Sequence, residues 1–343
     1  MRISRDTARG FVGVLLAFAI IALIHFIKPG VTAAPDYPCQ KSQKDSVVID
    51  IRSGESGSEI AQELFDKGVT ASYQSFFRVA VGDSRSGSIA PGLHSIDREI
   101  CAKDALDQLL ESARIGNLIS INEGAWNSEI KAKLRAIGYS KKEVDSAFSS
   151  SPRPDGFKSI EGLLFPAQYS FDSATSVSEI VAAMINRGQR EMRSAGLFDS
   201  SEKFSPYQFL IIASLVQAEG DTQDFAKISQ VVRNRLKIGM PLQFDSTVHY
   251  IKGTRGSVFL STQSTLLKSP YNSYRNYGLP PGPINNPGSR AMYAAVHPEK
   301  GAWLYFITVA PGDTRFTDSI DEFNNWKVLY KKNLRDGKFG SKK

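Results

Sequence analysis

The sequence has few of the side chains on which metal and covalent chemistry usually depend. It contains only four histidines and two cysteines among 343 residues, and none of their spacings is typical of a zinc site. No glycine-rich phosphate-binding loop is present. An S-x-x-K match at Ser200 and Lys203 lacks the further elements of penicillin-recognising enzymes. These absences argue against a metalloenzyme, a serine hydrolase or a nucleotide enzyme, and we expect no metal or cofactor.

The charge balance is positive, with a formal net charge of +7. Such an excess can attract nucleic acid, anionic lipid or an anionic polymer. No segment combines aromatic and basic residues as nucleic-acid-binding modules do. We therefore expect no nucleic-acid partner, and for an exported chain the charge indicates anionic lipid or an anionic wall polymer.

The N-terminal region has the pattern of a membrane anchor. An uncharged run, Phe11 to Ile27, follows three arginines and precedes Lys28. Its length is near the lower limit for a transmembrane helix, and the arginines place residues 1–10 in the cytoplasm. A cleaved signal peptide is the alternative, because residues 31–33 could form a cleavage site. We favour a retained single-pass anchor in the plasma (inner) membrane, with the remainder of the chain outside the cytoplasm.

Residues 28–45 carry three prolines and many polar side chains, as is typical of a linker. Cys39 lies in this linker, and the second cysteine is Cys101. An even number of cysteines in an exported chain often indicates a disulfide. Because the two are far apart in the sequence, two separate thiols remain the alternative.

An internal repeat organises the first half of the chain. Residues 51–69 align without gaps with residues 121–139. Each copy predicts a short strand, a glycine turn and an amphipathic helix, and Ser56 and Glu59 predict a capping box in the first copy. Such units must pack on partners to bury their apolar faces, so each is expected to join a small mixed sheet. Further helices are expected near residues 76–81 and 102–110.

Glu219 ends the most apolar helix that the sequence predicts. Ser205 and Pro206 supply an N-cap and a first helical residue, and Gly220 supplies the end. Burial against an apolar helix disfavours the charged form of a carboxyl group, so Glu219 could hold a proton near neutral pH and act as a general acid. The alternative is a solvated helix end, the usual place of a glutamate.

Two polar segments follow this helix. A second amphipathic helix leads to Asn234, and the segments 238–250 and 269–288 concentrate Asn, Gln, Asp and Tyr among Pro and Gly. This mixture suits hydrogen bonding to sugar hydroxyls and stacking on sugar rings. Well-formed turns without a ligand are the alternative for each segment taken alone.

Four motifs in this order resemble those of the endolytic murein transglycosylase, or YceG-like, family. They are EGLLFPAQYSF at 161–171, ASLVQAEG at 213–220, NRLKIGMPLQFDSTVHY at 234–250 and YNSYRNYGLPPGPINNPG at 271–288. The resemblance runs from the anchor to about residue 330. It implies an α+β protein with a small LysM-like α/β subdomain at 46–112, a larger mixed α+β catalytic domain at 113–335 and a tail at 336–343.

The function that this resemblance implies is lytic cleavage of nascent peptidoglycan near the membrane. Such an enzyme, a carbon–oxygen lyase, cuts the MurNAc–GlcNAc bond within a strand and leaves 1,6-anhydro-MurNAc ends, which could terminate strand elongation. The motif match makes Glu219 the catalytic acid. It places the following residues along the glycan cleft: Asn234, Gln243, Asp245, Asn272 and Tyr274. Penicillin-binding synthases are the partners that the resemblance suggests.

The chain departs from the usual family pattern at three positions. Thr314 and Phe323 stand where many relatives carry histidines, and Ser246 stands where a proline is usual. If this protein is active, those histidines are not essential to it.

One carboxylate is enough for this reaction, although glycoside hydrolysis ordinarily needs two. The acetamido group of the substrate can stabilise the developing cation, and its 6-hydroxyl replaces water. Asp221, Asp224 or Asp245 would permit ordinary hydrolysis if one of them lay across the cleft from Glu219. A non-catalytic, membrane-anchored peptidoglycan-binding scaffold is the alternative function.

Overall fold

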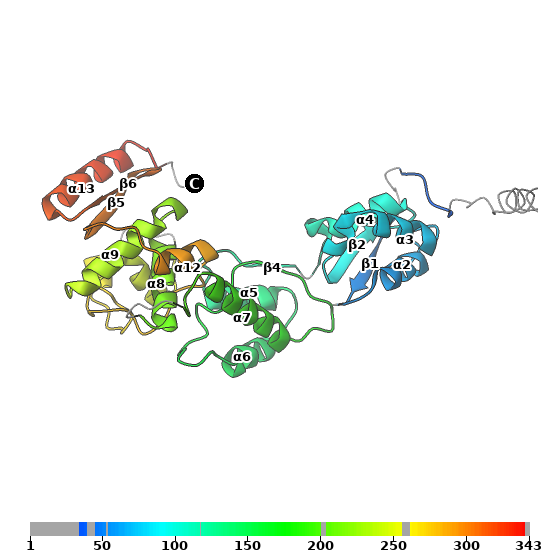
Figure 1. Cartoon of the computed structure of the whole chain (residues 1–343), viewed down its shortest axis with the longest axis horizontal. Helices are drawn as coiled ribbons and strands as arrows, with labels where there is room; N and C mark the ends of the chain where they lie inside the picture. The colour runs from blue at the N-terminus through cyan, green and yellow to red at the C-terminus, as the bar shows by residue number, and fades with distance from the viewer. Residues whose placement is uncertain are drawn as a thin grey trace, which may run out of the picture. The chain divides into compact units, whose positions relative to one another are not determined.

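The computed structural model in Figure 1 describes residues 34–39, 45–52, 54–116, 118–199, 204–255 and 261–339. The chain divides into two compact units, residues 1–116 and 117–343, which we describe separately. The expected anchor at 11–27 lies outside the described residues. Among the residues that are described, no helix is long and apolar enough to cross a membrane.

Over its described residues, the first unit combines a two-stranded antiparallel sheet with three α-helices. Strand β1 (Ser46–Ile51) pairs with β2 (Gly92–Asp97). The helices are α2 (Gly57–Asp66), α3 (Tyr73–Gly82) and α4 (Ala102–Leu110), and short 3-10 turns lie at Ser84–Ser88 and Ser112–Arg114. Apolar residues of both strands and all three helices form one core. The helices expected near residues 76–81 and 102–110 are confirmed as α3 and α4.

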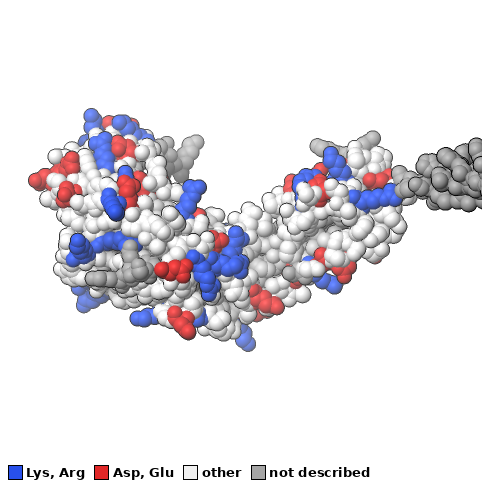
Figure 2. Space-filling model, viewed as in Figure 1, with Lys and Arg blue, Asp and Glu red and all other residues white. Residues whose placement is uncertain are grey.

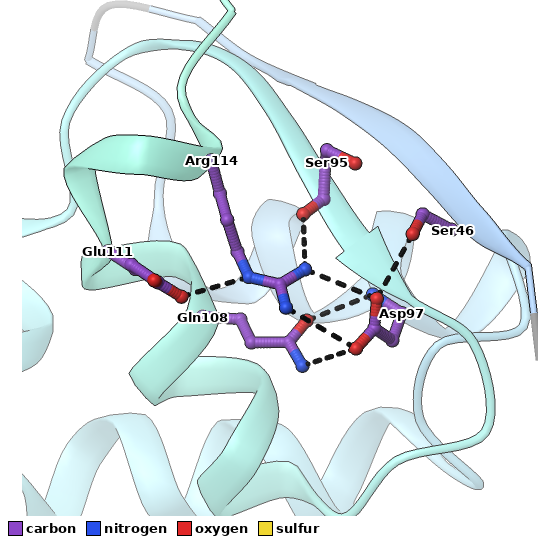
Figure 3. Close-up of polar contacts among 6 residues, drawn as sticks. All are labelled: Ser46, Ser95, Asp97, Gln108, Glu111 and Arg114. Carbon is purple, nitrogen blue, oxygen red and sulfur yellow. Dashed lines mark hydrogen bonds and ion pairs between the residues drawn. The ribbon is translucent and has the colours of Figure 1, made fainter. Parts of the chain in front are cut away.

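A polar cluster joins the two strands to the end of this unit (Figure 3). The Asp97 carboxylate accepts hydrogen bonds from Ser46 Oγ at 3.0 Å, Gln108 Nε2 at 2.9 Å and Arg114 Nη1 at 3.1 Å. Burial opposes ionisation of Asp97, but these hydrogen bonds outweigh it and lower the pKa of the carboxyl group. Arg114 also donates to the Ser95 carbonyl and the Glu111 carboxylate. The segment after α4 is thereby fixed to the sheet.

A disulfide joins Cys39 to Cys101, the residue before α4. Two further contacts hold the short segment that carries Cys39. The Asp36 carboxylate accepts a hydrogen bond from the Ala102 amide at 3.1 Å, and Ser72 Oγ donates to the Pro35 carbonyl at 2.7 Å. Residues 34–39, which the sequence assigns to the linker, are therefore docked on the first unit.

The second unit is mainly helical. Its helices are α5 (Asn127–Ala136), α6 (Lys141–Ser150), α7 (Val177–Ser194), α8 (Pro206–Glu219), α9 (Phe225–Lys237), α10 (Asp245–Lys252), α11 (Thr262–Thr265), α12 (Ser289–Val296) and α13 (Ile320–Arg335), with a 3-10 turn at Thr222–Asp224. Two antiparallel pairs complete it: β3 (Ile119–Ser120) with β4 (Gln168–Tyr169), and β5 (Tyr305–Ala310) with β6 (Asp313–Thr317). Helix α8 packs against α9, α10 and α12, while α13 packs on β5. The expected α+β class is confirmed.

Both copies of the repeat contain the expected helix, α2 in the first and α5 in the second. The expected strands lie earlier than predicted, because β1 ends at Ile51, the first residue of its copy, and β3 ends one residue before the second copy. The capping box of Ser56 and Glu59 is present. In the second copy Trp126 occupies the N-cap position, and its amide donates to the Glu129 carboxylate at 2.7 Å. The expectation of mixed sheets is wrong, because each described sheet has two antiparallel strands. In the first unit the two helices between β1 and β2 return the chain, so β2 runs opposite to β1.

Charged side chains of both signs are scattered over the face of the molecule drawn in Figure 2. On the face drawn in Figure 2, lysines and arginines lie among acidic side chains in both units. This distribution agrees with a modest basic excess spread over the surface.

Candidate functional site

Helix α8 forms for the reasons that its sequence suggests. Ser205 caps it with Gln208 in a reciprocal pair of hydrogen bonds, and Pro206 occupies the first helical position. Its middle is buried all round, as expected for a helix in the interior of a domain. Gly220 ends it where α9 crosses closely, because a Cβ there would lie 2.3 Å from Ile228 Cδ1. Glu219 is therefore the last residue of a buried apolar helix, next to the point where α9 crosses it.

Glu219 is half-buried. Its Oε1 atom accepts a hydrogen bond from the Ser246 amide at 3.4 Å. Burial raises the pKa of the carboxyl group to about 7; Asp245 adds to the rise, whereas Ser246 and the positive charge of Arg235 oppose it. Near neutral pH a large fraction of Glu219 is therefore protonated, which a general acid requires. The solvated-helix-end alternative does not fit this environment.

Asp245 and Tyr274 adjoin the acid. Asp245 is the first residue of α10, and the Tyr274 hydroxyl donates a hydrogen bond to its Oδ1 atom. Burial and the neighbouring Asp245 carboxylate raise the pKa of Tyr274, so this hydroxyl stays protonated as a donor. The structure thus brings Glu219, Asp245 and Tyr274 together from three of the sequence motifs.

The other three expected cleft residues have different surroundings. Asn234 Nδ2 donates to the Gly301 and Trp303 carbonyls at 3.0 and 2.8 Å. Asn272 is fully buried, and its side chain bonds backbone atoms of its own loop. Gln243 is exposed with a φ of 50°. Their contact with glycan stays a prediction, and two of them hold the chain segments around the site.

Arg235 is a residue near the acid that the motif match did not single out. Its side chain is 6% exposed. It donates to the Leu304 carbonyl at 2.7 Å and to the Leu242 carbonyl. Desolvation lowers the pKa of this guanidinium, and the nearby Glu219 carboxyl opposes that effect. A signal was present in the sequence, because Arg235 follows the apolar face of α9 at helical spacing from Ile228 and Val232.

A groove lies beside Glu219. One hollow of about 380 Å³ is lined by Gln217, Ala218 and Ser246, the last two of which adjoin Glu219 in the chain or in space. Trp126 and Arg255 also line it. A second hollow of about 390 Å³ extends toward Lys133. The two share Glu123, Gly124 and Arg255, so they form one groove. The contribution of the second repeat copy to this groove was not anticipated from the sequence.

Asn286 holds the wall of the groove together. Its Oδ1 atom accepts from the Gly162 amide at 3.1 Å and the Leu164 amide at 2.8 Å. Its Nδ2 atom donates to the Ala125 carbonyl and to Asn127 Oδ1, each at 2.9 Å. One fully buried side chain therefore joins the 161–171 motif, the 271–288 motif and the second repeat copy.

Glu161 lies beside this amide network. It is 7% exposed, accepts the Asn127 amide at 3.0 Å and accepts the Tyr250 hydroxyl at 3.3 Å. Burial raises the pKa of Glu161 to about 7, with the hydrogen bonds opposing the rise. Its contacts indicate a structural acid behind the groove.

These features define a class of protein: a groove-bearing α+β domain with one half-buried carboxyl at the end of an apolar helix. The chain belongs to the YceG-like family, whose sequence profile matches residues 49–328. A Bacillus subtilis protein named endolytic murein transglycosylase is 35% identical over 85% of this chain and 87% of its own. A protein of that name from Streptococcus pneumoniae is 25% identical, covering 83% of this chain and 58% of its own.

A solved structure agrees with this assignment. The crystal structure of a YceG-like protein from Listeria monocytogenes is 25% identical and has a TM-score of 0.55. The match covers 82% of this chain and 98% of that protein.

Ser246 offers a test of the electrostatics around Glu219. Its amide and hydroxyl both favour the ionised carboxylate. Ser246→Ala removes only the hydroxyl, whereas Ser246→Pro also removes the amide donor while a first-turn proline remains tolerated. We expect the kinetic pKa of the acid to rise in the order wild type, Ala, Pro, measured by the pH dependence of kcat/KM. An unchanged profile in the proline variant would exclude Ser246 from this role.

Proposed function

We propose that the protein is an endolytic peptidoglycan lytic transglycosylase that uses Glu219 as its acid and base. The observation that carries this proposal is a carboxyl with a pKa raised to about 7, placed beside a groove. Membership of the YceG-like family and relatives named endolytic murein transglycosylase support the substrate class. The scissile bond is the MurNAc–GlcNAc bond inside a strand.

The reaction proceeds in two proton transfers through one residue. Protonated Glu219 gives its proton to the leaving glycosidic oxygen as the bond from that oxygen to the anomeric carbon breaks. The acetamido oxygen of the muramyl residue stabilises the cation. The resulting Glu219 carboxylate then takes the proton of the 6-hydroxyl, whose oxygen closes onto the anomeric carbon. The product is a 1,6-anhydro-MurNAc end, and Glu219 is again protonated.

Asp245, which is hydrogen-bonded to Tyr274, affects the pKa of Glu219. A carboxylate close to another carboxyl group disfavours a second negative charge, so Asp245 helps Glu219 to retain its proton. The Tyr274 hydroxyl donates a hydrogen bond to one carboxylate oxygen of Asp245. With its carboxylate held in this way, Asp245 serves as an electrostatic neighbour in the proposed reaction. We include Gln243, Asn234 and Asn272 as the remaining candidates for contact with glycan.

The proposed setting is the outer face of the plasma membrane. The uncharged run at 11–27 supplies a single-pass anchor with a cytoplasmic N-terminus, and the catalytic unit acts on strands near the membrane. Penicillin-binding synthases, which make such strands, are the proposed partners. Crosslinking in cells that recovers no synthase would count against this association.

Product analysis tests the reaction. Full-length protein is incubated with purified peptidoglycan, and the released fragments are identified by mass spectrometry. Anhydro-muramyl ends support the transglycosylase, whereas reducing ends would show a hydrolase with a second working carboxylate. Strand binding without any product would favour the non-catalytic scaffold.

A further inference from the structure

Glu123 is a groove carboxylate that has no role in the reaction proposed above. It lies where the two hollows join, because both are lined by it. The side chain is exposed, and it makes no hydrogen bond or ion pair with the other residues that the structure describes. Arg255, its cationic neighbour in the groove, is committed to Glu129 at 2.6 Å and to the Gly124 carbonyl at 2.7 Å. Glu123 therefore carries an unpaired negative charge into the groove.

The backbone beside Glu123 is fixed. The Gly124 amide donates to the Asn286 carbonyl at 2.8 Å, and the Asn286 amide donates to the Ala125 carbonyl at 2.9 Å. This antiparallel bridge joins the second repeat copy to the segment before α12. Glu123 lies two residues before the bridging residue Ala125, so buried structure sets the position of its backbone.

The carboxylate of Glu123 packs on Gly288. A Cβ at that position would lie 2.1 Å from Glu123 Oε1, so only glycine leaves room for the carboxylate. The Gly288 amide donates to Gln217 Oε1 at 2.9 Å. Gln217 lies two residues before Glu219 on the last turn of α8. Gly288, on which Glu123 packs, is therefore hydrogen-bonded to the helix that carries the acid.

The proposed reaction calls for an anionic group in this place. When the acetamido oxygen of a muramyl residue bonds to the anomeric carbon, positive charge spreads onto the acetamido nitrogen and its N–H becomes a stronger donor. A preorganised carboxylate that accepts this hydrogen bond stabilises the charge as it develops. Asp245 already receives the Tyr274 hydroxyl, whereas neither oxygen of Glu123 accepts a hydrogen bond from another residue in the described part of the chain.

We propose that Glu123 accepts a hydrogen bond from the acetamido N–H of the muramyl residue bound beside Glu219 and orients that group for attack on the anomeric carbon. This inference rests on the proposed transglycosylase function. As the bond to the leaving oxygen breaks, Glu219 protonates that oxygen and the acetamido oxygen bonds to the anomeric carbon. The 6-hydroxyl oxygen then displaces the acetamido oxygen and returns its proton to Glu219. Glu123 neither gains nor loses a proton.

Two variants of the full-length protein test this role. Glu123→Gln removes the charge, and we expect kcat to fall about 100-fold while KM changes less than about threefold. Gly288→Ala keeps the charge and suits the local backbone φ of −78°, but its methyl group displaces the carboxylate; we expect a similar fall. The double variant should lose no more than Glu123→Gln alone, because both changes remove one interaction. Glu299→Gln, an exposed glutamate outside the groove, is the matched control.

The substrate supplies the decisive measurement. With short glycan strands whose muramyl residues are N-methylated on the acetamido nitrogen, the N–H is missing and Glu123→Gln should no longer lower kcat relative to wild type. An equal loss on both substrates, or wild-type kcat for Glu123→Gln on normal strands, would overturn the assignment. Melting temperatures within about 3 °C of wild type exclude misfolding. The products of the wild-type protein are read first, so reducing ends there would refute the proposed function itself, separately from the role of Glu123.

Discussion

Glu219→Gln is expected to lower the rate of anhydro-muramyl product formation at least about 10³-fold, the loss typical for removal of a general acid. Glutamine has nearly the same shape but can neither donate an acidic proton nor take one from the 6-hydroxyl. Because one residue serves both transfers, the substitution removes both steps of the proposed reaction. The measurement is mass spectrometry of strands digested by wild type and variant in parallel, with binding assayed by co-sedimentation.

Asp221→Asn is the control for this variant. Asp221 follows Gly220 and is exposed, so the substitution likewise replaces a carboxyl group by an amide close to the same helix end. We expect near wild-type rates. Comparable losses in both variants would show that net charge at this end of α8, rather than the proton of Glu219, governs the rate.

The pH dependence of kcat/KM also tests whether Glu219 is the general acid. The active form has Glu219 protonated, and its pKa of about 7 keeps that form populated up to neutral pH. We therefore expect kcat/KM to fall as pH rises through about 7. A fall centred near 4.5, the ordinary value for glutamate, would mean that burial does not raise the pKa as described.

Asn286→Ala is expected to lower the free energy of unfolding of the second unit by about 4 kcal/mol, since two buried amides lose their acceptor and two acceptors lose a donor. These amides belong to Gly162 and Leu164. In a unit of this size the change corresponds to a fall in Tm of about 10 °C. Thermal unfolding followed by circular dichroism measures it.

Asn285→Ala provides the matched comparison. Asn285 is equally buried, but its Nδ2 atom makes one hydrogen bond, to the Ser214 carbonyl at 2.8 Å. We expect a loss of about 1 kcal/mol. Equal losses for the two asparagines would mean that cavity formation, rather than the amide network of Asn286, sets the cost.

Local features of the chain were predictable because local physics determines them. The N-cap at Ser205, the glycine end at Gly220 and the capping box at Ser56 follow from side chains within four residues. The raised pKa of Glu219 was also anticipated, since an apolar helix predicts desolvation. The motif resemblance placed Asp245 and Tyr274 in the same cleft as Glu219, and the structure has both residues near that acid.

Long-range pairing explains what the sequence did not reveal. The groove depends on Asn286 meeting Ala125 across 161 residues, and no periodicity within either segment indicates that contact. The sequence places Arg235 at the end of the second helix but gives it no role, because its carbonyl partners, Leu242 and Leu304, lie in later segments of the chain. The direction of each strand pair likewise depends on the path of the chain between its strands, which is a two-helix connection for β1–β2 and a tight turn for β5–β6.

The docking of residues 34–39 by the Cys39–Cys101 disulfide has a consequence for the proposed membrane anchor. In the proposed anchored form, a linker of eighteen residues, 28–45, would extend to about 60 Å at about 3.5 Å per residue. With residues 34–39 fixed to the first unit, only the six residues 28–33 remain between anchor and unit, about 20 Å at most. An oxidised protein would thus attach its first unit close to the lipid surface. Release of residues 34–39, which requires reduction of the disulfide and loss of the hydrogen bonds at Pro35 and Asp36, would lengthen that attachment about threefold.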